Sequence, residues 1–189
     1  TMNMDRLVIK QVLGNEQVTW YYVVSLIGKT LVLLIAPINT IVISYLTKRK
    51  ELLTRSQFGK AVLAGGGVSL VFFLACQVGT PLFVWLFYRN LYDSVKGLVT
   101  VVNLAQILGL FSAFLFILVL TFTDEKWQLW IQLAHFAVLL VTSVLAARAY
   151  GMIGFAWASL GANSLRVAAV IILGLVKAGK DKGGSNADR

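Results

Sequence analysis

The chain has 189 residues, of which 58% are hydrophobic and 13% are charged, and its formal net charge is +9. About a quarter of the residues of a soluble domain are charged, so this composition excludes an ordinary soluble domain. The basic balance does not indicate a nucleic-acid partner, because no basic stretch with interleaved aromatic residues lies outside the apolar runs. The single cysteine, Cys76, lies in an apolar run and has no second cysteine with which to pair.

Four stretches without charge, and a fifth interrupted only by Arg166, are long enough to cross, or nearly cross, a bilayer, which needs about 20 apolar residues of helix. They predict an all-α, polytopic transmembrane bundle in residues 1–178, with spans, in chain order, at about 17–47, 58–88, 95–123, 127–147 and 151–177. Residues 6–14 read as the end of a preceding helix, and a chain that begins with Thr1 is expected to be a piece of a longer protein. Residues 179–189 are rich in Gly, Lys and Asp, and we expect a disordered cytoplasmic tail there.

The distribution of Lys and Arg predicts the orientation of these helices. With the expected spans, ten basic residues fall on one side of the membrane: Lys48, Arg49, Lys50, Arg55, Lys60, Lys126, Lys177, Lys180, Lys182 and Arg189. Five fall on the other: Arg6, Lys10, Arg89, Lys96 and Arg148. Cytoplasmic loops carry the excess of Lys and Arg, so the C-terminus is predicted to be cytoplasmic in a multi-pass protein of the cell membrane.

Two cations lie inside predicted spans. Lys29 is about eight residues past an aromatic cluster at the start of the first span, and Arg166 is near the middle of the last. Such groups are expensive in the membrane and usually face a cavity or a partner. None of the five spans contains Asp or Glu, so we expect the counter-charge on protein outside this chain or on an anionic ligand. The alternative is that both side chains snorkel to the interface.

Uncharged polar residues recur at helical spacing in the spans and predict a common hydrated interior. The candidate substrate-binding residues are Lys29, Asn39, Asn103, Gln106, Gln132, His135, Asn163 and Arg166. The alternative is that the amides hold helices together by hydrogen bonds, and that His135 is a packing residue rather than a proton relay. Gly154, Ala158 and Ala162 predict close packing against a neighbouring helix.

No metal site or cofactor is expected, because no second His, Cys or carboxylate lies at helical spacing from His135. The chain also lacks a phosphate-binding Gly loop, a nucleophile elbow and paired carboxylates, so we do not expect an enzyme. A membrane glycosyltransferase would have to use Asp93, Asp124 and Glu125, which lie in very short turns.

Three segments resemble a known family. Residues 4–14 (MDRLVIKQVLG), the APINT of residues 36–40 followed by a basic loop, and residues 150–159 (YGMIGFAWAS) are similar, in order and spacing, to elements of polysaccharide flippases. These flippases belong to the multidrug, oligosaccharidyl-lipid and polysaccharide exporter superfamily. The resemblance covers roughly residues 4–176.

The resemblance implies the later lobe of a two-lobed transporter, which flips a polyprenyl-pyrophosphate-linked oligosaccharide across the cytoplasmic membrane by alternating access. The implied partners are membrane lipid, the anionic lipid-linked saccharide, and an N-terminal lobe supplied by the same chain or by a second copy. Lys29 and Arg166 would then contact the headgroup, by role rather than by a matched motif. Two alternatives stay open: a cation-coupled drug exporter of the same superfamily, and a membrane scaffold without transport.

Overall fold

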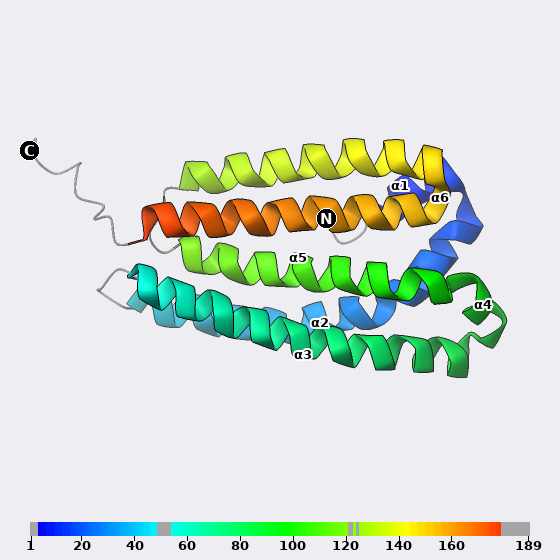
Figure 1. The fold of residues 1–189 in the computed structure, drawn as a ribbon, viewed down its shortest axis with the longest axis horizontal. Helices are drawn as coiled ribbons and strands as arrows, with labels where there is room; N and C mark the ends of the chain where they lie inside the picture. The colour runs from blue at the N-terminus through cyan, green and yellow to red at the C-terminus, as the bar shows by residue number, and fades with distance from the viewer. Residues whose placement is uncertain (1–3, 49–53, 121–122, 124, 179–189) are drawn as a thin grey trace, which may run out of the picture.

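The computed structural model describes residues 4–48, 54–120, 123 and 125–178, and within them every regular element is a helix (Figure 1). The helices, in chain order, are α1 (Met4–Leu13), α2 (Asn15–Lys48), α3 (Arg55–Phe87), α4 (Tyr92–Val95), α5 (Val99–Leu120) and α6 (Glu125–Lys177). Short 3-10 turns flank α4 between α3 and α5. The predicted all-α class is thus confirmed, whereas the predicted tail, 179–189, lies outside the described residues.

Helix α5 is the centre of the bundle and contacts α2, α3 and α6. Its sequence is apolar on all sides, and a helix of that kind is stable only when it is surrounded by other apolar groups. Leu115, Val119 and Val102 are among its fully or almost fully buried residues. By contrast, α3 and α6 expose large apolar side chains outward, among them Leu63, Val78 and Trp130. This outward apolar surface is typical of helices in contact with lipid.

Helix α6 reverses direction at one residue. Gly151 has φ 65° and ψ −147°, a left-handed conformation that glycine adopts without the steric cost of a side chain. The two arms of α6 therefore run back along each other (Figure 1), and His135 and Val138 of the first arm line a common groove with Ala162 and Arg166 of the second. The chain thus makes an antiparallel pair of helices without an intervening loop.

The arms approach most closely beside this turn. A Cβ added at Gly154 would collide with the carbonyl oxygen of Ala146, so only glycine fits there. Of the three residues predicted to pack closely, Gly154, Ala158 and Ala162, Gly154 makes such a contact in the structure. The neighbour is the other arm of the same helix.

The predicted count of membrane spans is wrong. Among the described residues, three helical stretches are long and apolar enough to cross a membrane: Arg55–Phe87, Arg89–Leu120 and Leu129–Lys177. Five helices of ten residues or more are present there, not five full spans plus the end of a sixth. The predicted fourth and fifth spans correspond to the two arms of α6, which meet at Gly151 without an intervening loop.

Helix α1 folds back onto the bundle. Gly14 follows it with φ 94°, and this left-handed residue turns the chain from α1 into α2. Ile9 of α1 is fully buried in a core cluster with Val23 and Val24 of α2 and Phe155 of α6. This packing places the first turn of α1 beside the middle of the bundle, although α1 is only ten residues long.

Candidate functional site

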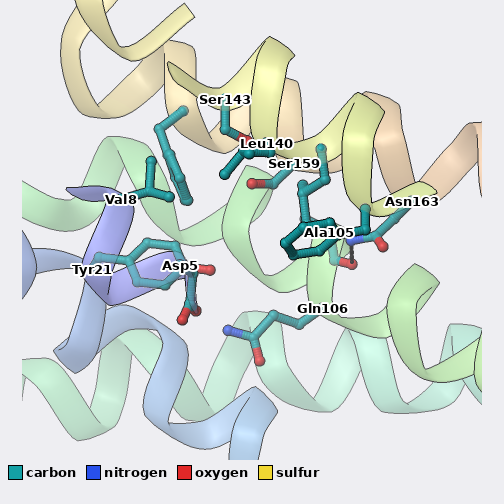
Figure 2. Close-up of a pocket in the computed structure, with 12 residues that line it drawn as sticks. Asp5, Val8, Tyr21, Ala105, Gln106, Leu140, Ser143, Ser159 and Asn163 are labelled. Atoms are coloured by element: carbon teal, nitrogen blue, oxygen red, sulfur yellow. Dashed lines mark hydrogen bonds between the residues drawn. The ribbon is translucent and has the colours of Figure 1, made fainter. Parts of the chain in front are cut away.

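A cavity of about 150 Å³ lies where α1, α2, α5 and both arms of α6 meet (Figure 2). We call it the central cavity. Its polar lining consists of Asp5, Tyr21, Gln106, Ser143, Ser159 and Asn163. The remaining lining residues are apolar, chiefly Phe and Leu from α6. The cavity thus collects the polar groups of five helical segments in an otherwise apolar bundle.

The charged group of the central cavity is Asp5, which forms an ion pair with Lys29. The Lys29 Nζ donates a hydrogen bond of 2.7 Å to Asp5 Oδ2, and the two side chains are 16% and 19% exposed. The Tyr21 ring flanks the pair, with its centroid 5.4 Å from the Lys29 Nζ. The expectation that Lys29 has no carboxylate partner within the chain is therefore wrong. No span contains an acidic residue, but α1 folds back and brings one to Lys29.

Two of the predicted amides line the central cavity. Gln106 Nε2 donates a hydrogen bond of 3.2 Å to the Ser25 carbonyl oxygen, and Asn163 Nδ2 donates one of 2.9 Å to the Ala105 carbonyl oxygen. Each amide is thus held by a backbone group of a neighbouring helix while its side chain borders the cavity (Figure 2). Both roles proposed for such amides, hydrogen bonding between helices and lining a polar interior, occur at these positions.

Asn103 lies elsewhere, at the contact between α5 and α3. Its Nδ2 donates to the Cys76 carbonyl oxygen (3.1 Å) and to Gln77 Oε1 (3.2 Å), and its Oδ1 accepts from the Thr80 hydroxyl (3.3 Å). Asn103 is fully buried, and it does not line the central cavity. Its hydrogen bonds have the geometry expected of a residue that joins two helices.

Arg166 and His135 form a second polar site, outside the central cavity. They face each other across the groove between the arms of α6, about 150 Å³ in volume, whose other lining residues are aliphatic. We call it the hairpin groove. The Arg166 guanidinium also lies 5.4 Å from the centroid of the Phe116 ring on α5. The groove and the cavity share no lining residue, so the structure separates the two predicted cations into different sites.

Two further predicted site residues are Gln132 and Asn39. Gln132 is exposed on the first arm of α6. Asn39 belongs to α2, but its side chain lies outside what the structure describes. Within residues 4–48, 54–120 and 125–178, no three His, Cys, Asp or Glu side chains come together as metal ligands.

Sequence reasoning missed Asp5, Tyr21 and Ser143. Asp5 lies one residue before the helix end predicted at residues 6–14, and only the reversal at Gly14 brings it beside Lys29. The available signal was the left-handed tendency of glycine directly after a helix, which favours a sharp return of the chain. Comparison of the chain with family models, with curated proteins and with solved structures finds no match.

Proposed function

We propose that this chain is part of a membrane transporter that flips a polyprenyl-pyrophosphate-linked oligosaccharide across the cytoplasmic membrane by alternating access. The observation that supports it most is the Asp5–Lys29 pair in a polar cavity inside a bundle of membrane-spanning helices. Charges inside a membrane domain are expensive and usually serve a substrate or ion pathway. The resemblance of residues 4–176 to polysaccharide flippases names the substrate class.

The volume of the central cavity indicates whether this conformation encloses a headgroup. Its 150 Å³ is below the range of about 300–1,000 Å³ typical of pockets that enclose a small-molecule ligand. A sugar headgroup therefore enters only after the helices around the cavity separate. Opening between α1 and α2 would break the Asp5–Lys29 pair and make Lys29 accessible to the headgroup.

In this proposal the described helices form one lobe of the transporter. The second lobe belongs to the same protein or to a second copy. α6 crosses the membrane twice, because its two arms turn at Gly151. The basic residues of the 48–60 loop and of the C-terminus lie in the cytoplasm, by the excess of Lys and Arg on that side.

The test is translocation of a fluorescent polyprenyl-pyrophosphate-linked oligosaccharide in proteoliposomes that contain the full-length protein. The double variant Lys29→Gln/Arg166→Gln is expected to lose translocation while it still inserts and folds. The matched control is Arg55→Gln/Lys60→Gln, which removes the same charge from two exposed positions. Normal translocation by the first double variant would refute the flippase, and the scaffold would then be the better account.

A second candidate is a cation-coupled exporter, which the presence of Asp5 in the cavity favours. A carboxylate in the interior of a transporter is the group that binds a proton or a metal cation. Asp5→Asn separates the two candidates. A coupled exporter loses cation-driven uptake of a cationic dye into inverted vesicles, whereas a flippase without coupling at Asp5 retains lipid translocation.

A further inference from the structure

The hairpin groove contains two nitrogen atoms that need a partner. Arg166 Nε and His135 Nδ1 are both buried, and neither has a hydrogen-bond partner in the described part of the protein. The two ion pairs found there are Lys29–Asp5 and Lys96–Asp93, so no described carboxylate neutralises Arg166. A buried polar group without a partner destabilises a structure, and a buried cation does so more strongly.

The groove has the composition of an anion site with apolar walls. Arg166 offers a planar fork of N–H donors that matches phosphate oxygens, and the His135 ring, which also contacts the Ala162 backbone, adds a second polar group from the opposite arm. Ile131, Val138 and Leu165 supply hydrocarbon walls on both sides of the polar pair. The volume of 150 Å³ is several times the roughly 30 Å³ that one water occupies in the liquid. The groove therefore has room for a polar group larger than a single water.

The depth of the groove in the membrane limits which headgroups can reach Arg166. Arg166 is 15 residues beyond Gly151 and 11 residues before Lys177, or about 22 Å and about 16 Å along the helix. With a hydrocarbon core of about 30 Å centred on this arm, Arg166 is inside the core by roughly 10 Å. The headgroup of a resting lipid stays at the interface, but a headgroup in transit passes through this depth.

We propose that the hairpin groove binds a phosphate group carried by a lipid, held by Arg166 and His135 with the hydrocarbon chain along the aliphatic walls. This inference rests on the proposed function for the identity of the lipid, a polyprenyl-pyrophosphate carrier. It goes further by assigning the phosphate to the groove and leaving the central cavity to the remainder of the headgroup. An ordinary phospholipid also carries a phosphate group and is the alternative ligand.

The experiment measures equilibrium binding of radiolabelled farnesyl pyrophosphate to the full-length protein in maltoside micelles and phosphate-free buffer. Arg166→Gln is expected to weaken binding at least tenfold, the loss typical of a charge-assisted hydrogen bond. His135→Gln is expected to weaken binding about threefold, because a neutral donor contributes less. Arg55→Gln, the same change at an exposed site, should leave binding unaltered.

Competition with unlabelled compounds tests whether the phosphate or the hydrocarbon chain is bound, and which lipid carries it. Farnesol, which has the chain without the phosphate, is expected to compete poorly, and equal competition by farnesol would overturn the phosphate site. Phosphatidylglycerol decides the source: if it competes as well as farnesyl pyrophosphate, the site stands and holds an ordinary lipid phosphate. If it does not, the site stands and the carrier pyrophosphate is the ligand.

Arg166→Lys guards against a variant that fails to fold, since it keeps the charge and loses only the planar fork. It is expected to bind several-fold more weakly than the unaltered protein. Binding unchanged in both Arg166 variants would overturn the inference. If the full-length protein binds farnesyl pyrophosphate in an Arg166-dependent way but does not translocate the lipid-linked oligosaccharide, the proposed function is refuted and the phosphate site stands. The two failures are therefore distinguishable.

Discussion

The two cations inside this bundle occupy comparable positions and have opposite surroundings. Lys29 is 14 residues into α2 and Arg166 is 15 residues past the turn of α6, so each lies about 21–22 Å along its helix from the end nearer Gly14 or Gly151. Lys29 is paired at 2.7 Å with the carboxylate of Asp5, which lines the central cavity. Arg166 contacts the Phe116 ring and has an unpartnered Nε in the hairpin groove.

This difference teaches that an intramembrane cation does not by itself indicate a ligand. At Lys29 the counter-charge is intramolecular, and the ion pair stabilises the packing of α1 on α2. At Arg166 the described protein supplies the Phe116 ring, His135 and aliphatic groups but no carboxylate, so the cation is available for an external anion. Substitutions at the two sites should therefore change stability in opposite directions.

The largest effect is expected from Asp5→Asn, which removes the counter-charge of Lys29. Breaking a buried ion pair costs about 3–5 kcal/mol, and the residual exposure of this pair reduces the expected loss to about 2–3 kcal/mol. Thermal unfolding in detergent, followed by tryptophan fluorescence, measures it. Asp93→Asn is the matched control, because the exposed Asp93–Lys96 pair at 2.9 Å should contribute nothing measurable. Equal stability of the two variants would contradict the structural role of the Asp5–Lys29 pair.

Gly154→Val tests whether both sites depend on the closure of α6. Its side chain would collide with the Ala146 carbonyl, so the arms must separate, at a cost of about 2 kcal/mol. We expect lower thermal stability together with weaker binding of farnesyl pyrophosphate in the hairpin groove. Gly161→Val is the control on the same arm, since an added Cβ there meets nothing within 4 Å. A similar loss in both variants would mean that the contact with Ala146 is not responsible.

A smaller effect is expected when Asn103, which is buried, is compared with Asn163, which is half-buried. Asn103→Leu removes three hydrogen bonds between α5 and α3, and at about 0.6 kcal/mol for each bond inside a membrane this amounts to roughly 1–2 kcal/mol. Asn163→Leu removes one, to the Ala105 carbonyl, and should cost less than about 1 kcal/mol. Unfolding in increasing SDS ranks the two. If Asn163→Leu is the more damaging, then Asn163 supports the bundle rather than the central cavity.

Arg166→Met should have the smallest effect and the opposite sign. It replaces a buried, unneutralised cation with an apolar side chain of similar length, so stability in detergent should stay equal or rise by up to about 1 kcal/mol. Lys29→Met, measured in the same way, should lower stability because it leaves Asp5 unpaired. A loss at Arg166 as large as that at Lys29 would show that Arg166 has a counter-charge within the protein.

The candidate site was only partly predictable. Gln106 and Asn163 were identified from polar residues at helical spacing, and both line the central cavity. The same spacing selected Asn103 and Gln132, which lie between two helices and on the exposed surface. Periodicity reports which residues share a face of one helix, but it does not report which neighbour that face meets. The division of the polar residues into a cavity and a groove depended on the packing partners.

The sequence by itself determined that the chain is all-helical and that it has helices apolar and long enough for a membrane. Both properties follow from local composition, because uncharged apolar runs need lipid or other helices around them and helices satisfy their own backbone groups. Only the tertiary structure decided that the two arms of α6 reverse at Gly151 without a loop and that Asp5 meets Lys29 across 24 residues of chain. Such contacts depend on two left-handed glycines, at positions 14 and 151, which set the direction of everything that follows them. A change of direction at one residue leaves almost no trace in composition, yet it determines which charges become neighbours.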